Sequence, residues 1–97
     1  MKTIDINARG WFDKVNGNSY FSARVTLDYG TESEQSFVLP FQYGYGDMYL
    51  QVAEKELIRR NVVKESTTCL KYWCQDNGII FRSNIRRGCL KRELKNV

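Results

Sequence analysis

The basic side chains of this 97-residue chain are concentrated near its C-terminal end. Residues 82–97 contain six lysines and arginines and one acid, whereas residues 1–81 contain nine basic and ten acidic side chains. This short segment therefore accounts for the whole formal charge of +4. Arginine binds phosphate and carboxylate groups through paired hydrogen bonds, so the cluster favours an anionic ligand. The alternative is a solvated basic segment that keeps a small protein soluble. The basic candidates for a ligand-binding site are Arg82, Arg86, Arg87, Lys91 and Arg92.

A loop rich in glycine and tyrosine supplies the other candidates. Residues 41–46 read FQYGYG and precede an expected helix. Backbone N–H groups at a helix N-terminus attract anions, and aromatic rings stack on nucleobases. Asp47 would repel an anion there, and a tight turn explains the two glycines equally well. We include Tyr43 and Tyr45 in the candidate ligand-binding site, and both interpretations of the loop stay open.

The residue types that catalysis most often uses are missing or scattered. The chain has no histidine, which excludes a Ser-His or Cys-His nucleophile, a histidine base and a histidine-ligated metal. Glu54 and Glu56 are two residues apart on an expected helix and do not face each other. Neither a nucleophile motif nor a phosphate-binding loop motif occurs. We therefore predict that the protein is not an enzyme and that it has no metal and no cofactor.

The cysteines and the apolar segments bear on the compartment. Three cysteines, Cys69, Cys74 and Cys89, are an odd number without zinc-site spacing, which predicts buried or half-buried free thiols. The apolar runs are too short to cross a bilayer. Residues 1–6 alternate in polarity and include an acid, unlike a signal peptide. We expect a cytoplasmic protein that does not bind a membrane.

Alternating polarity in the first 40 residues predicts three strands. The first covers residues 2–8 and continues through Trp11 and Phe12, and Asn16-Gly17 then forms a hairpin turn. A second strand follows from about residue 20 to residue 28. A third runs over residues 35–39, where Pro40 ends it or marks a sheet edge. Together these segments predict a three-stranded antiparallel meander.

The second half of the chain predicts two helices and another strand. Asp47 is expected to cap a helix over residues 48–60, and Ser66 is expected to cap a shorter helix that ends at Asn77-Gly78. Residues 79–85 return to strand character. The remaining residues form a last strand and short helix, or become ordered only on binding. The predicted fold is one α+β domain over residues 1–97, in which one longer helix packs on the antiparallel β-meander and a second short helix precedes a returning C-terminal strand.

Aromatic side chains are abundant, at 13% of the chain. The core set is expected to be Phe12, Phe21, Phe37, Phe41, Trp73 and Phe81, and the surface set Tyr20, Tyr29, Tyr43, Tyr45 and Tyr49. Tyrosine and arginine together are enriched at binding surfaces. A chain of this length gains stability by pairing, and a meander leaves edges to cover, so we expect a homo-oligomer.

Two stretches carry a resemblance to a known group of proteins. Residues 10–22 read GWFDKVNGNSYFS and residues 40–47 read PFQYGYGD. Over roughly residues 1–58, together with the RGCLKR stretch at 87–92, the chain resembles a family of small phage and prophage proteins. The resemblance implies a dispensable phage accessory gene. Such genes often encode inhibitors of host defence, of which some bind CRISPR effector complexes and some sequester nucleotide second messengers.

These observations lead to one expected function and two alternatives. We expect a non-catalytic, anti-CRISPR-like counter-defence protein whose basic C-terminal segment binds a phosphate-bearing ligand, nucleic acid included, or the nucleic-acid-binding surface of a host defence effector. One alternative is a sponge that sequesters a nucleotide second messenger. The other is a protein–protein inhibitor that acts through the helix at 47–60 or through a strand edge.

Overall fold

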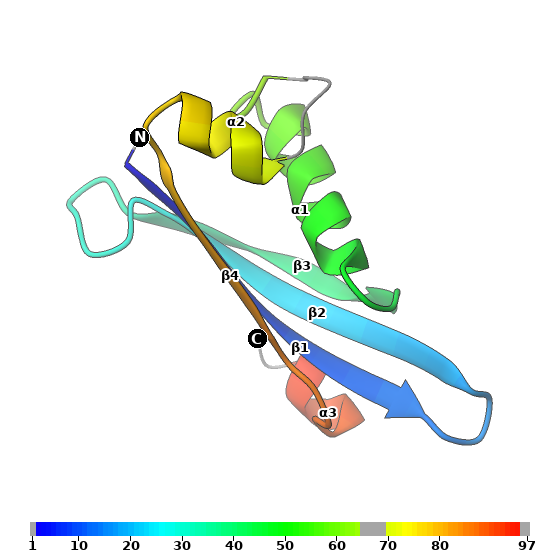
Figure 1. Cartoon of the computed structure of the whole chain (residues 1–97). Helices are drawn as coiled ribbons and strands as arrows, with labels where there is room; N and C mark the ends of the chain where they lie inside the picture. Colours follow the sequence, from blue (N-terminus) through cyan, green and yellow to red (C-terminus); the bar gives the residue numbers. More distant parts are fainter. Residues whose placement is uncertain (1, 65–69, 96–97) are drawn as a thin grey trace.

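The computed structural model describes residues 2–64 and 70–95, which form an α+β fold (Figure 1). The elements in chain order are β1 (Thr3–Asp13), β2 (Asn18–Leu27), β3 (Gln35–Tyr43), α1 (Met48–Arg59), α2 (Leu70–Asp76), β4 (Ile80–Arg86) and α3 (Lys91–Leu94). The predicted class is therefore confirmed, as are the longer helix, the second short helix and the returning C-terminal strand. In the described part of the chain, no helix has the length and apolar character that crossing a bilayer requires.

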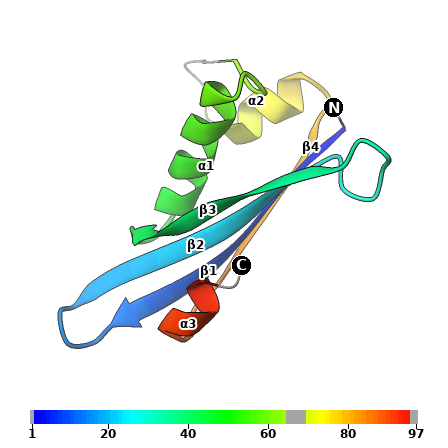
Figure 2. The ribbon, with the colours of Figure 1, turned by 180° about the vertical axis from the view of Figure 1, so that it is seen from behind.

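The strands form one mixed sheet in the order β3-β2-β1-β4. Neighbours β1 and β2, and β2 and β3, are antiparallel, which confirms the predicted meander. β4 pairs with β1 in parallel (Figure 2). A parallel pair needs a long crossover, and the segment that contains α1 and α2 provides it. The last strand thus lies beside the first, although more than sixty residues separate them in sequence.

Local chemistry explains the turn between β1 and β2. Gly17 adopts a positive φ of 69°, which a side chain disfavours. Its N–H donates to the carbonyl of Asp13 at 2.8 Å. The Asp13 carboxylate accepts hydrogen bonds from the side-chain amide of Asn16 and from the backbone N–H groups of Asn16 and Val15, which lowers the pKa of Asp13. The predicted Asn-Gly hairpin is therefore confirmed, with Gly17 alone of the two residues in the positive-φ region.

β3 differs from its predicted end. The strand continues beyond Leu39 to Tyr43, so the proline does not end it. The register against β2 shifts between Phe21 and Ala23, which places an irregularity opposite Pro40. β3 is an edge strand, and a proline at an edge removes no hydrogen bond from a neighbour. The prediction of an edge position is therefore confirmed.

Strand alternation gives the sheet two different faces. We call the face that packs on α1 and α2 the inner face, and the opposite one the outer face. The inner face is apolar: Ile4, Ile6, Ala8, Phe21, Ala23, Val25 and Leu27 are buried there. Tyr49, Ala53 and Leu57 of α1 cover this face. Full burial of one such leucine contributes roughly 1.5–3 kcal/mol to folding.

Three predicted aromatic positions are wrong, among them Phe41, which was expected in the core and instead stacks on Tyr20 outside it. Tyr49 was expected at the surface and is 5% exposed, because it lies on the buried side of α1. Phe12 was expected in the core and is 52% exposed, because β1 extends past the covered part of the inner face toward the hairpin. Alternation assigns a side chain to a face of the sheet, and the helix above decides how much of that face is covered.

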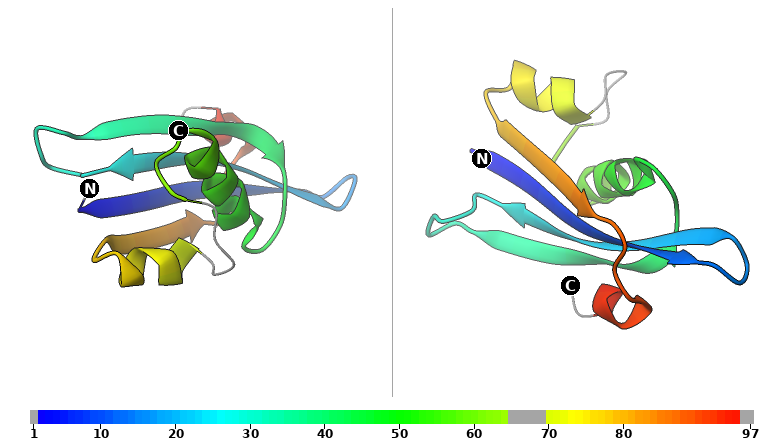
Figure 3. Two further views of the ribbon diagram at one scale, coloured as in Figure 1. Left: turned by 90° about the horizontal axis from the view of Figure 1, so that it is seen from above. Right: turned by 60° about the horizontal axis from the view of Figure 1, so that its bottom comes forward.

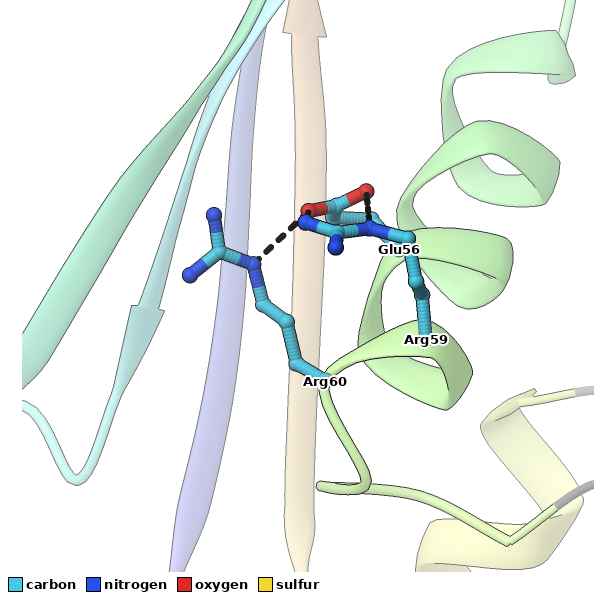
Figure 4. Close-up of polar contacts among 3 residues, drawn as sticks. All are labelled: Glu56, Arg59 and Arg60. Atoms are coloured by element: carbon cyan, nitrogen blue, oxygen red, sulfur yellow. Dashed lines mark hydrogen bonds and ion pairs between the residues drawn. The ribbon is translucent and has the colours of Figure 1, made fainter.

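An ion-pair cluster anchors the end of α1 to the sheet. Glu56 accepts hydrogen bonds from Arg59 and Arg60, the second at 2.8 Å (Figure 4). The Arg60 guanidinium lies 4.1 Å from the centre of the Phe37 ring of β3. Asn61, with a φ of 60°, follows the end of the helix. At the other end the prediction is wrong in part, because the side chain of Asp47 makes no capping hydrogen bond.

The crossover returns to the sheet through α2. Leu70 and Cys74 of this helix are buried, and Gly78, with a φ of 69°, ends it as predicted. The predicted cap at Ser66 lies outside the described residues. In β4, Phe81 and Ile85 pack against the core, as expected for Phe81.

The residues after β4 cross to the other side of the sheet, where α3 lies on the outer face (Figure 3). Gly88 makes the turn with a φ of 74°, and Cys89 donates its N–H to the carbonyl of Gly10. Leu94 is 1% exposed and fixes the short helix to the sheet. Nη1 of Arg9 donates to the carbonyl of Glu93 at 2.8 Å. The C-terminal segment through residue 95 is thus ordered against the sheet, as a short helix rather than a further strand.

Candidate functional site

Alternation along β4 separates the basic residues that sequence places together. Arg82 and Arg86 point to the outer face, where they pair in register with Asp5 and Arg9 of β1. Arg87 lies one residue beyond the strand and lines a hollow on the inner face with Phe21 and Ile85. The predicted ligand-binding residues therefore do not form one site.

The outer face carries a polar surface that includes four arginines. It consists of two adjoining hollows of about 500 and 280 Å³. Both are lined by Asn7, Arg24 and Asn84. We call these residues, with Arg9, Arg82 and Arg86, the arginine surface. Asp5 is the one acid among the residues that line the two hollows. The residues that line the two hollows, Asp5 included, thus carry a formal charge of +3.

The arginines of this surface differ in their partners. Arg82 forms a two-point ion pair with Asp5, at 2.6 and 3.1 Å. Arg24 donates to the hydroxyl of Ser36 at 3.1 Å, and Arg9 holds the carbonyl of Glu93. Among the described residues, Arg86 makes no side-chain hydrogen bond or ion pair. Its register neighbour is Arg9, and like charges at neighbouring positions of a sheet repel each other.

An aromatic cluster lies at the end of the outer face near the hairpin. Tyr20 stacks on Phe41 with ring centres 5.0 Å apart, and it contacts Trp11 and Tyr43 at 5.5 and 5.9 Å. Lys91 of α3 lies over this cluster, 5.5 Å from the Trp11 ring and 5.8 Å from the Phe41 ring. A cation over an aromatic face is attracted by the π electrons. Lys91 and Tyr43 thus contact different rings of one cluster, and Arg92 lies exposed on the same short helix as Lys91.

Tyr45 links the aromatic cluster to the inner face. Its ring contacts that of Tyr43 at 6.4 Å. It also lines a hollow of about 100 Å³, together with Phe12, Phe21 and Arg87. We call this hollow the inner pocket. It joins two predicted residues, Tyr45 and Arg87, that are 42 positions apart in sequence.

The glycines of the loop at 41–46 have structural reasons of their own. A Cβ on Gly44 would lie 2.5 Å from the Phe21 ring, which leaves no room for a side chain. Gly46 has a φ of 58°, in the region that glycine favours. Packing and turn geometry therefore account for both glycines, which favours the tight-turn interpretation of the loop.

The described cysteines are structural in character. Cys74 and Cys89 are free and buried, as predicted for both. Burial raises the pKa of the Cys74 thiol to about 11, which suppresses the reactive thiolate. Cys69 lies outside the described residues. Within residues 2–64 and 70–95, no three acidic or cysteine side chains gather into a group that could hold a metal ion.

Sequence reasoning missed two of the four arginines of the arginine surface. Arg9 and Arg24 lie at neighbouring positions of the paired strands β1 and β2, on the side opposite the buried apolar residues. The signal that could have found them is their shared polar face with Asn7. These residues can be recognised as part of one surface with Arg82 and Arg86 only when the pairing of β4 with β1 is known.

Comparisons with protein-family models, with curated proteins and with solved structures found no match for this chain.

Proposed function

We propose that the chain is a non-catalytic protein that binds the phosphate backbone of nucleic acid on its arginine surface. The observation that carries this proposal is the pairing of Arg86 with Arg9. Three arginines and no acid line the smaller hollow, which they share with Asn7 and Asn84. A phosphate between Arg9 and Arg86 relieves their repulsion and accepts several charge-assisted hydrogen bonds.

The shape of the arginine surface favours binding of a nucleic-acid strand over binding of an enclosed small molecule. The two hollows adjoin and lie on the outer face of the sheet, where α3 covers only the part near the hairpin. Neutral donors and acceptors, Asn7 and Asn84, alternate with the arginines along β1 and β4. Phosphate contacts of this kind give affinity with little dependence on sequence.

The biological role that we propose is counter-defence by a phage accessory protein. Its support is the resemblance of residues 10–22 and 40–47 to small phage proteins. A protein with this surface would occupy guide or target nucleic acid and so keep it from a host effector. The alternative of a protein–protein inhibitor acting through α1 has less support, because the outward residues Gln51, Lys55 and Arg59 form a polar face.

The test is a salt titration of binding to fluorescein-labelled single-stranded RNA and DNA of about 12 nucleotides, a length within the range that small single-strand-binding folds cover. We expect both probes to bind, with affinity that falls steeply as salt increases. Arg86→Gln should weaken binding and reduce the salt slope by about 0.7, the change expected for one lost phosphate contact. Arg87→Gln, the neighbouring change on the opposite face, is the matched control and should leave both quantities near wild type. Absence of binding at low salt, or equal binding by wild type and Arg86→Gln, would overturn the proposal.

A further inference from the structure

The inner pocket is a hollow that is lined by aromatic side chains. Phe12 and Tyr45 are 52% and 63% exposed at its margin, although both are large aromatic residues. Phe21, which is 2% exposed, and Ile85 supply apolar lining. Ligand sites are concave, mostly apolar and supplied with a few polar groups, and this hollow has that composition.

The inner pocket has one positively charged residue in its lining. Arg87 is the only charged residue among those that line it. Within the part of the chain that the structure describes, its guanidinium makes no hydrogen bond or ion pair. The lining combines apolar and aromatic surface with an available cation, so it is complementary to a planar ring that carries an anionic group.

The volume of the inner pocket limits the size of the ring that a ligand can place in it. A dry cavity of about 150 Å³ in another protein holds a benzene molecule. The inner pocket measures about 100 Å³ and is open to solvent. It therefore accommodates one six-membered ring that stays partly exposed, and a fused two-ring base is too large to enter fully.

We propose that the inner pocket binds a pyrimidine nucleotide, with the base against Phe12 and Tyr45 and the phosphate on Arg87. The base stacks on aromatic surface that is otherwise exposed to water. The phosphate gives Arg87 the partner that it lacks. This site lies on the opposite face from the arginine surface, so it does not depend on backbone binding there.

The experiment is calorimetric titration of the full chain with uridine 5′-monophosphate, uridine, adenosine 5′-monophosphate, inorganic phosphate and phenylacetate. We expect uridine monophosphate to bind at least about tenfold more tightly than uridine or inorganic phosphate, each of which lacks one half of the ligand, and than adenosine monophosphate, whose fused base is too large to enter fully. Phenylacetate has the ring but carries less negative charge than a phosphate, so it should also bind more weakly. A pyrimidine-only oligonucleotide, titrated with and without its 5′-phosphate into wild type and Arg87→Gln, distinguishes a strand end from the free nucleotide as the source of the same group. A gain in affinity from the 5′-phosphate that Arg87→Gln abolishes assigns the pocket to strand ends, and the absence of such a gain assigns it to the free nucleotide.

Matched variants connect the binding to the pocket. Arg87→Gln should reduce the affinity for uridine monophosphate to that for uridine, whereas Lys55→Gln, which removes an exposed cation of α1 outside both proposed sites, should leave it unchanged. Phe12→Leu keeps an apolar side chain at an exposed position. It should weaken the binding of uridine monophosphate and of uridine by about the same factor. Thermal unfolding of each variant checks that the fold is intact.

Three results would overturn the inference: no saturable binding of uridine monophosphate up to about 10 mM, equal binding by wild type and Arg87→Gln, or tighter binding of phenylacetate. Because Arg86→Gln and Arg87→Gln are expected to act on different ligands, failure here is distinguishable from failure of backbone binding on the outer face.

Discussion

Arg86 and Arg87 are consecutive in sequence and lie on opposite faces of the sheet. Arg86 is the last residue of β4 and pairs in register with Arg9 on the outer face. Arg87 lines the inner pocket beside Phe21. Arg86→Gln and Arg87→Gln each remove one positive charge from the same short segment. A difference between the two variants therefore reports on the face of the sheet and not on net charge.

The ion pair of Arg82 with Asp5 restrains one cation of the arginine surface. Asp5→Asn should tighten binding of a single-stranded oligonucleotide several-fold and steepen the salt slope by about 0.7, because Arg82 becomes available to a phosphate. Stability should change by less than about 1 kcal/mol, as is usual for a pair at the surface. Fluorescence anisotropy across a salt series measures the first effect, and urea unfolding measures the second.

The matched control is Glu32→Gln, which removes one negative charge in the exposed turn before β3. Tightening of the same size in both variants would show that net charge alone acts, and that the pairing of Arg82 is irrelevant to binding.

A buried hydroxyl on the outer face lacks a partner. Ser22 is 0% exposed, and its Oγ makes no hydrogen bond with the described residues. An unsatisfied buried polar group destabilises a fold, so Ser22→Ala should raise the free energy of unfolding, by up to about 1 kcal/mol. Urea unfolding with an unchanged m-value measures this. The exposed Ser83→Ala is the control, and a clear loss of stability in Ser22→Ala would mean that an internal water satisfies the hydroxyl.

The close contact between Gly44 and Phe21 predicts intolerance of a methyl group. A Cβ at residue 44 would lie 2.5 and 2.8 Å from two carbons of the Phe21 ring, which is fully packed in the core. Gly44→Ala should therefore lower stability by about 1–3 kcal/mol, the usual range for overpacking. Gly10→Ala, whose Cβ would meet its nearest neighbour at 3.5 Å, should be nearly neutral in the same thermal unfolding measurement.

The strands and helices were predictable because their periods are local properties of the chain. Ile4 and Ile6 alternate with polar residues, and Leu57 follows Ala53 at helical spacing, so faces and element types follow from sequence. The place of β4 beside β1 depends on pairing across more than sixty residues, and no local pattern specifies it. For that reason the segment after residue 81 looks like one basic cluster in sequence, whereas the folded chain divides it among two faces and a short helix.

The pH dependence of stability should reveal the ion pair that anchors α1. Hydrogen bonds from Arg59 and Arg60 lower the pKa of Glu56 from 4.5 to about 2 (Figure 4). A depressed carboxyl pKa contributes stability that is complete above pH 4.5, because both the folded and the unfolded chain are then ionised. As pH falls from 4.5 toward about 2, the unfolded chain takes up a proton that the folded chain does not, and the contribution is lost.

Glu56→Gln lacks this carboxylate, so the difference in melting temperature between wild type and Glu56→Gln should be constant above pH 4.5 and close by about pH 2. Asp13 and Asp28, whose pKa values are also lowered by hydrogen bonds, act equally in both proteins and cancel in the difference. Glu54→Gln removes a carboxylate from the same helix that forms no ion pair with the described residues. The difference in melting temperature between Glu54→Gln and wild type should therefore not change with pH over the same range. If the difference for Glu56→Gln were also independent of pH, the ion-pair cluster at the end of α1 would not stabilise the fold.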